Sequence, residues 1–285
     1  MKDRVSPKIL LKKKIYQKLR YHFLNRHIFA LTSQLRVTPD FLIIGAKRCG
    51  TTSLYEHLGN HPCIKKSIYD HIGFFDDNYH LGKNFYKSFF ITKFEKKYLE
   101  KKFGKCITYD VTSSYIQKSV TASRVFEMFP KIKIIAILRN PIDRAYSEYN
   151  SHSRVNKTIA TFESYIENEI IRIENGCDEY YDNLQERSYL TKGFYFKQLK
   201  PWFDLFPKEN ILILSTEEFD QNTENVFNKI FNFLDIKEFS IVNAKKMEKG
   251  KYPNLNIETR EKLSKFYRSR NFELYQLIGK NFMWN

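Results

Sequence analysis

One stretch, FLIIGAKRCGTTSLYEHL at residues 41–58, constrains the fold more than any other part of the sequence. Its first six residues form a short apolar run ending in Gly-Ala, which is typical of a strand buried on both faces. Its last eight residues place Leu54 and Leu58 four apart, and a Gly follows at once, so this part predicts a helix. A strand, a glycine-containing loop and a helix in this order are typical of nucleotide-binding domains.

Two further apolar runs extend this pattern. KIKIIAILRNP at 131–141 predicts a second buried strand, followed by a helix from about Pro141 to Tyr149, and NILILS at 210–215 predicts a third strand, followed by the helical pattern TENVFNKIFNFL. Strands that alternate with helices favour a parallel sheet with helices on both faces. We therefore expect a single α/β domain built on a P-loop-like parallel sheet.

The segments between these elements are less regular. Residues 63–110 are rich in aromatic side chains and predict irregular structure, whereas 150–192 is charged and predicts helix. From Leu255 onward, apolar residues recur at helical spacing, which predicts terminal helices. Loops that follow strand ends are where α/β sheets bind ligands, so the functional residues should follow the predicted strands.

Residues 1–38 form a basic arm ahead of the predicted domain at 39–285. The formal net charge is +16, and the arm holds ten Lys or Arg against one acid, which leaves 38 basic and 31 acidic residues, a net of +7, for the rest. Ile15, Leu19 and Phe23 recur at roughly helical spacing, so we expect the arm to be helical. It either packs on the domain's own surface or makes peripheral contact with an anionic membrane.

Cysteine usage favours a reducing compartment, and hydropathy predicts no membrane span. Cys49, Cys63, Cys106 and Cys177 show no CxxC or Cys/His spacing, so the sequence predicts neither a zinc site nor a disulfide framework. No apolar run reaches the ~20 residues of a membrane span, and the first residues lack the apolar core of a secretory signal. We therefore expect cytoplasmic residence.

The loop itself reads GAKRCGTT, whereas nucleoside triphosphatases have GxxxxGK[ST]. Thr51 occupies the position of the lysine that reaches the β- and γ-phosphates, so part of the machinery for γ-phosphoryl transfer is missing. Backbone amides at the helix start still form an anion cradle, and Lys47 and Arg48 add positive charge. The loop thus predicts a terminal phosphate bound without a metal. Cys49 is either a thiol of lowered pKa or a small side chain that fits the loop.

A second group of polar residues follows the second predicted strand, in LRNPIDRAYSEY. Pro141 suits a first helical turn, where its missing N–H costs little. Arg139 at the strand end can form paired hydrogen bonds to a phosphate, and Ser147 adds a hydroxyl two turns into the helix. Because parallel strands end at the same edge of a sheet, this group predicts a second phosphate site beside the first.

Two neighbouring phosphate sites indicate a nucleotide with phosphates at both ends of its ribose. IIGAKRCGTTSLYEHL is similar to the 5′-phosphosulfate-binding loop of the sulfotransferases that use 3′-phosphoadenosine 5′-phosphosulfate (PAPS), and LRNPIDRAYSEY is similar to their 3′-phosphate-binding motif. IGFFDDNYHLGKNFY (72–86), YDVTSSY (109–115) and the C-terminal segment resemble the heparan sulfate branch of that family. The resemblance covers roughly 39–285 and implies sulfuryl transfer from PAPS.

The resemblance also implies roles for individual residues. Arg48 stands where the family usually has a catalytic lysine, and because a guanidinium does not give up its proton, its role here would be electrostatic. Arg139 and Ser147 would bind the 3′-phosphate, and the loop at 249–251 would cover the nucleotide. The full predicted nucleotide-binding set is Lys47, Arg48, Cys49, Gly50, Thr51, Thr52, Ser53, Arg139, Ser147, Lys249, Gly250 and Lys251.

The catalytic base is where this sequence departs from the family pattern. In the heparan sulfate enzymes a Glu stands three residues before the first Phe of an FF pair, and here that position holds His71, preceded by Asp70. A neutral imidazole can accept the proton, so His71 is the predicted base, with Asp70 orienting it or acting as the rival base. Val111 replaces a Lys that often contacts the acceptor, and His80 either lines the acceptor side or makes a structural hydrogen bond.

The predicted acceptor is a hydroxyl or amine of a glycan, because the matching segments belong to the glycan-modifying branch and an acidic polysaccharide suits a positive surface. A lipid or small-molecule acceptor is the alternative. A nucleotide-dependent kinase is disfavoured by Thr51, and a non-enzymatic basic binding module by the placement of the cations at strand ends. No nucleic-acid motif is present, so nucleic acid is not an expected partner. Animal relatives work in the Golgi lumen, which would apply here if the sequence is part of a longer protein.

Overall fold

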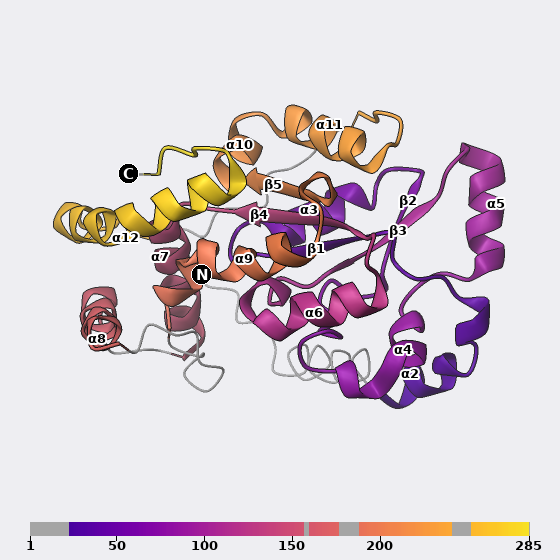
Figure 1. The fold of residues 1–285 in the computed structure, drawn as a ribbon, viewed down its shortest axis with the longest axis horizontal. Coiled ribbons are helices and arrows are strands. Elements are labelled where there is room, and N and C mark those ends of the chain that lie inside the picture. Colours follow the sequence, from indigo (N-terminus) through magenta and orange to yellow (C-terminus); the bar gives the residue numbers. More distant parts are fainter. Residues whose placement is uncertain (1–22, 157–159, 177–187, 241–251, 285) are drawn as a thin grey trace, which may run out of the picture.

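Five parallel strands form the centre of the computed structural model, which describes residues 23–156, 160–176, 188–240 and 252–284 (Figure 1). Their order across the sheet is β2-β3-β1-β4-β5. The strands are β1 (Phe41–Gly45), β2 (Ile64–Lys66), β3 (Ile107–Val111), β4 (Lys133–Leu138) and β5 (Ile211–Ser215). The predicted α/β fold with a parallel sheet is confirmed, and the three predicted strands are β1, β4 and β5.

The central strand, β1, explains why the strands of this sheet are continuous apolar runs. All five residues of β1 are buried, and Ile43 pairs with Val111 of β3 on one side and with Ile135 of β4 on the other. A strand in this position has apolar cover on both faces, so every residue benefits from being apolar and no alternation appears.

Helices connect the strands and cover the sheet. They are α2 (Phe23–Ala30), α3 (Thr51–Leu58), α4 (Gly82–Lys87), α5 (Lys93–Phe103), α6 (Ser119–Met128), α7 (Pro141–Asn156), α8 (Phe162–Glu174), α9 (Tyr195–Leu205), α10 (Thr216–Gln221), α11 (Thr223–Leu234) and α12 (Ile257–Ile278). Short 3₁₀ turns are η1 (Ser33–Leu35), η2 (Tyr79–Leu81), η3 (Tyr115–Gln117), η5 (Thr191–Gly193) and η6 (Lys208–Asn210).

The helices lie on both faces of the sheet, as predicted. On one face α6 and α9 lie side by side, and Phe126 of α6 packs 5.3 Å from Phe206 at the end of α9 (Figure 1). On the other face α3 meets α11, where the rings of His57 and Phe227 are 6.0 Å apart. The chain runs through α3 from β1 outward to the edge strand β2, and later through α6 from β3 back past β1 to β4. Because these two connections run in opposite directions across the sheet, right-handed crossovers place α3 and α6 on opposite faces.

Helix α7 begins directly after β4 and therefore marks the carboxyl end of that strand. Because the sheet is parallel, the carboxyl ends of all five strands lie on this side, on the left in Figure 1. There α7, α8 and α12 enclose a second, smaller apolar cluster that includes Ile142, Phe162 and Tyr267. This cluster supports α7, which carries the predicted phosphate-binding residue Ser147 and begins two residues after Arg139.

Residues 63–110 are more regular than predicted. They contain β2, β3, α4 and α5, so the prediction of irregular structure is wrong. The three residues of β2 include one buried side chain, and α5 is highly charged, so neither shows an apolar period. A cap begins α5 instead, since the Thr92 hydroxyl accepts a hydrogen bond from the Glu95 amide. The C-terminal segment also differs, because it forms one 22-residue helix, α12, rather than several.

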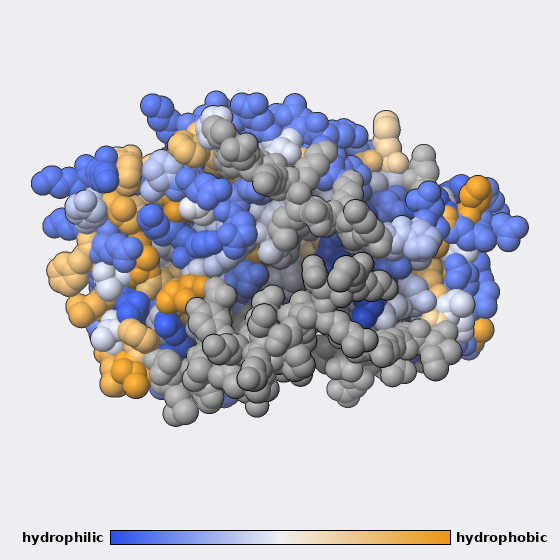
Figure 2. Space-filling model, turned by 180° about the vertical axis from the view of Figure 1, so that it is seen from behind, coloured by the Kyte–Doolittle hydropathy of each residue, from blue (hydrophilic) through white to orange (hydrophobic). Residues whose placement is uncertain are grey.

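The described end of the basic arm packs on the domain, since α2 and η1 contact α4. Ile15 and Leu19, which carried the helical prediction, lie outside the described residues. Figure 2 shows a largely hydrophilic surface over α11 and apolar patches along the edge of α2 and α5, where Leu31 and Phe94 are exposed. Among the helices that the structure describes, none is long and apolar enough to cross a membrane.

Candidate active site

The loop between β1 and α3 has the backbone of an anion cradle. Gly45 adopts a φ of +153°, and a Cβ there would lie 2.5 Å from the Ile116 side chain, so the close approach requires glycine. Gly50, with a φ of +96°, precedes α3 in the left-handed conformation and has no side chain to cap the helix. The first N–H groups of α3 have no intrahelical partner, and the helix dipole makes this end favourable for an anion. The backbone thus fits a phosphate group.

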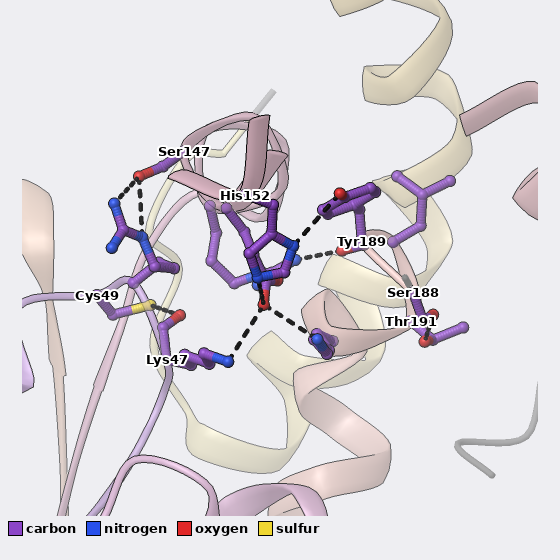
Figure 3. A network of polar contacts seen from close by, with 12 residues as sticks. Lys47, Cys49, Ser147, His152, Ser188, Tyr189 and Thr191 are labelled. Carbon is purple, nitrogen blue, oxygen red and sulfur yellow. Dashed lines mark hydrogen bonds and ion pairs between the residues drawn. The ribbon is translucent and has the colours of Figure 1, made fainter. Parts of the chain in front are cut away.

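Arg48 joins this loop to helix α7. Its guanidinium donates to the Ser147 Oγ from Nη2 at 3.2 Å and from Nε at 3.4 Å. The sequence assigned Arg48 and Ser147 to two different phosphates, and the fold brings them into contact across 99 residues of chain (Figure 3). Burial lowers the pKa of Arg48, and the nearby charges of Arg139 and Arg154 lower it further. Arg48 and Arg139 therefore lie together at the ends of β1 and β4, and Arg154 stands further along α7.

A buried carboxylate lies behind this cluster. Glu148 of α7 accepts a hydrogen bond from Arg144 at 2.8 Å and another from Lys192 at 3.0 Å, and Lys47 of the loop lies 3.7 Å from it. Figure 3 shows Lys47 and His152 approaching this carboxylate from different sides. Burial alone would raise the pKa of Glu148, but Arg144 and Lys192 lower it to about 2. Glu148 is thus ionised at neutral pH and fixes Lys47 beside the cradle.

The other loop side chains are divided between the interior and the surface. Thr51 and Ser53 are buried, whereas Thr52 is exposed. Cys49 is fully buried, with its Sγ 3.7 Å from the Tyr195 hydroxyl, and burial raises its pKa to about 11. The alternative of a reactive thiol of lowered pKa is therefore wrong, because desolvation outweighs the nearby positive charges. Cys49 is the small side chain that fits the loop.

The candidate base lies in the segment between β2 and η2. His71 is exposed, Asp70 is half-buried, and an open pocket of about 200 Å³ lies beside His71. Two residues further on, the amide of Gly73 donates to the Thr112 Oγ1 at 3.3 Å. Thr112 follows β3 and in turn donates its amide to the carbonyl of Ile43 in β1. The segment is thereby held at the strand end next to the phosphate cradle.

Three adjacent strand ends therefore carry the predicted groups in a fixed order. The candidate base segment is tied to the end of β3, the cradle follows β1, and Arg139 with Ser147 follows β4. Val111, where related enzymes often have a Lys, is buried within β3 and packs in the core, so it contributes nothing to the surface of the site. His80 is exposed in η2, and no hydrogen bond of its side chain is seen in the described region.

The predicted nucleotide-covering residues Lys249, Gly250 and Lys251 lie outside the described residues. Tyr252, the next residue, returns to the site, since its ring lies edge-on 5.4 Å from Tyr146 of α7. Sequence reasoning missed Tyr252, although an aromatic residue directly after a predicted nucleotide loop is a usable signal. In the ranges that the structure describes, no group of His, Cys, Asp or Glu is arranged to hold a metal ion.

The comparisons with known proteins agree with this geometry. The family model described as "Sulfotransferase domain" matches residues 38–283. The human bifunctional heparan sulfate N-deacetylase/N-sulfotransferase 2 is 27% identical over 271 residues, which is 85% of this chain and 30% of that protein. The human enzyme numbered 1 in the same series is 28% identical over 274 residues, with the same coverage. This chain thus spans about a third of the length of these relatives.

Among solved structures, a sulfotransferase from Alicyclobacillus acidocaldarius superposes with a TM-score of 0.67 at 25% identity. The match covers 86% of this chain and 97% of that one. The similarity therefore extends over the sheet, the cradle and the helices that follow the strands, rather than over one motif.

Proposed function

Because this chain belongs to the sulfotransferase domain family and is a sulfotransferase enzyme, we propose that it transfers a sulfuryl group from PAPS to a glycan acceptor. The observation that carries the choice of donor is the contact between Arg48 and Ser147. It joins a cradle for a 5′-phosphate to a helix whose start suits a 3′-phosphate, and PAPS has both groups. ATP has no 3′-phosphate, so it would leave the second predicted phosphate site, at Arg139 and Ser147, empty.

The residues present fit this donor. The glycine cradle and the start of α3 would hold the 5′-phosphosulfate, with Thr52 exposed at the first turn, and Arg139 with Ser147 would hold the 3′-phosphate. When bound, PAPS supplies the sulfuryl group and a phosphate that leaves with extra negative charge. Arg48 lies where it can stabilise that charge, because a guanidinium keeps its proton and its hydrogen-bond donors are already oriented.

The segment of Asp70 and His71, which is tied to the end of β3, would remove the proton from the acceptor. His71 is exposed to the pocket, so a hydroxyl or amine can reach its ring; the acceptor's lone pair attacks sulfur, the bond to the leaving phosphate breaks, and the imidazole takes up the acceptor's proton. Asp70 either orients this ring or acts as the base itself. In-line transfer needs the base and the leaving phosphate on opposite sides of the sulfuryl group, and the attachment of the base segment and the cradle to the adjacent strands β3 and β1 supports this assignment.

The pocket beside His71 also supports a glycan as acceptor. Half-buried Tyr69 supplies an aromatic ring of the kind that stacks on sugar rings, and Arg26 of α2 supplies a cation for an acidic substituent, while Phe89 is buried beneath them. The relatives named above are N-sulfotransferases of heparan sulfate. We therefore propose the amine of a glucosamine residue in an acidic polysaccharide as the preferred group, with a sugar hydroxyl as the alternative.

A pair of matched acceptors tests this proposal. Radiolabelled PAPS should transfer its label to de-N-sulfated heparin, whose glucosamine amines are free, and much less to the same material after N-acetylation. Equal labelling of both would identify a hydroxyl acceptor. No labelling of either polysaccharide by an enzyme that binds the nucleotide product would contradict the glycan proposal and favour a lipid or small molecule.

A further inference from the structure

A fully buried carboxylate lies under the candidate base segment. Asp110 of β3 is fully inaccessible to solvent. It accepts hydrogen bonds from three hydroxyls, those of Tyr115 at 2.8 Å, Tyr86 at 2.9 Å and Thr112 at 3.1 Å. Burying a carboxylate costs free energy, and hydrogen bonds from neutral hydroxyls offset this cost only in part. We therefore expect Asp110 to have a role beyond packing. The pKa of Asp110 shows this cost, since burial raises it to about 6 although the hydroxyls lower it.

Two of the three hydroxyls also bind the segment that carries His71. The Tyr115 Oη accepts from the amide of Phe74 at 2.9 Å, and the Thr112 Oγ1 accepts from the amide of Gly73 at 3.3 Å. Each hydroxyl has a single hydrogen. Because an amide N–H already points at each oxygen, each hydroxyl must direct its own hydrogen at Asp110. The result is two parallel relays, from amide to hydroxyl to carboxylate.

The direction of these relays requires an acceptor at position 110. Ionised Asp110 has only acceptor oxygens, so it can receive all three hydroxyls at once. An Asn there would place an NH₂ group against at least one hydroxyl hydrogen, and that hydroxyl would turn away from the segment. The left-handed φ of Gly73, +64°, and the two bonds from the Asn78 side chain to the carbonyls of Ile72 and Gly73 complete the support.

We propose that Tyr115, oriented by Asp110, is a positioning residue that holds the segment of Asp70 and His71 in place for proton removal from the acceptor. The proposal rests on the function proposed above, because it assigns the catalytic base to that segment. Thr112 acts in the same way on the neighbouring amide. None of the hydrogen bonds of this relay is made by a cradle residue, although Gly45 of the cradle packs against Ile116, the residue after Tyr115.

Tyr86 provides a matched control. It is also fully buried, and its hydroxyl donates to the same Asp110 oxygen at nearly the same distance, 2.9 Å against 2.8 Å for Tyr115. It accepts no bond from the base segment in the described structure. A role limited to stabilising the buried carboxylate predicts equal effects of Tyr115→Phe and Tyr86→Phe, whereas the relay predicts different ones.

The test compares these two variants in the full chain. Tyr115→Phe should lower kcat for transfer from PAPS to de-N-sulfated heparin by about 10- to 100-fold, because small displacements of a base are costly. Tyr86→Phe should lower it less than about threefold, and both should bind 3′-phosphoadenosine 5′-phosphate as the wild type does. Equal losses of kcat in the two variants, or a loss of nucleotide affinity confined to Tyr115→Phe, would overturn the proposal.

Amide hydrogen exchange gives a readout that does not depend on activity. The amides of Phe74 and Phe75, which donate to the Tyr115 hydroxyl, should exchange faster in Tyr115→Phe than in Tyr86→Phe, and Thr112→Val should speed exchange at Gly73. Unchanged exchange in Tyr115→Phe would refute the relay whatever the acceptor is. If the wild type transfers no sulfuryl group but exchange still differs between the variants, the relay stands and the proposed function fails.

Discussion

Two buried carboxylates, on neighbouring parts of the same site, are held in opposite ways. Glu148 lies among Arg144, Lys192 and Lys47, and these cations lower its pKa to about 2. Asp110 lies among hydroxyls, and burial raises its pKa to about 6. Both side chains are fully buried. The difference therefore comes from their partners and not from their depth in the protein.

This contrast separates the two tasks of the site. On the α7 side, the cations outnumber Glu148, as the proposed phosphate site requires, and ion pairs keep these cations in position. On the β3 side, directed hydrogen bonds to the buried carboxylate keep the candidate base segment in position instead. Substitutions on the α7 side should therefore weaken nucleotide binding, whereas substitutions on the β3 side should lower turnover.

The largest effect is expected at Arg48. Arg48→Ala should reduce kcat/KM by about 1,000-fold, because it removes the charge that faces the leaving phosphate, and it should also weaken nucleotide binding. Arg48→Lys restores the family's usual residue and should recover most of the activity. Steady-state kinetics with both variants, and with the exposed Lys101→Ala on α5 as a control for net charge, would decide this. If Arg48→Ala binds and turns over like Lys101→Ala, Arg48 has no role on the phosphate side.

A smaller effect, confined to turnover, is expected at His71. His71→Ala should lower kcat by about 100-fold, the usual contribution of general base catalysis, and leave the affinity for 3′-phosphoadenosine 5′-phosphate unchanged. Asp70→Asn should cost less, since it removes only an orienting partner. Kinetics and calorimetric titration of both variants separate the two outcomes. The reverse order, with Asp70→Asn inactive and His71→Ala near wild type, would make Asp70 the base.

The smallest effect is a difference in how stability depends on pH. The pKa of Glu148 is lowered by folding, so its contribution is present above its unfolded pKa and is lost as the pH falls from about 4.5 toward 2. The pKa of Asp110 is raised by folding, so its contribution is present below about 4 and is lost as the pH rises through about 6. The two groups thus act with opposite sign.

Urea unfolding at several pH values measures this difference. Between pH 4 and pH 7 the stability advantage of wild type over Asp110→Asn should shrink by about 2 kcal/mol, whereas its advantage over Glu148→Gln should grow by less than about 1 kcal/mol, because most of the Glu148 change lies at lower pH. Parallel curves for the two variants would show that the partners of these carboxylates do not set their pKa values.

More of the α7 side than of the β3 side could be predicted from the sequence. The apolar run of β1, the glycines of the loop and the polar residues after β4 are local signals, and the parallel sheet brings them to one edge. The contact between Arg48 and Ser147 joins residues 99 apart, so only the fold could show it. Glu148 was missed, although Arg144 and Glu148 stand four apart on one helix face, which is a usable sign of an ion pair.

The Asp110 relay left no sequence signal of its function. Its strand, ITYDV, contains a Thr and an Asp among apolar residues, which reads as an ordinary half-polar strand rather than a fully buried one. Tyr86 and Tyr115 come from separate elements and look like core aromatics, because the position of a hydroxyl is invisible in composition. Such networks depend on hydrogen-bond direction, which is set only when distant segments have packed.

The central claim, a site for two phosphates, is tested most directly by thermal unfolding with 3′-phosphoadenosine 5′-phosphate. At about 100 times its dissociation constant this ligand should stabilise the chain by about 2.7 kcal/mol, while AMP, which lacks the 3′-phosphate, should do so only at far higher concentration. Ser147→Ala should reduce the difference between the two ligands. Stabilisation by ATP with magnesium but not by the bisphosphate would contradict the account and identify the loop as one for a nucleoside triphosphate.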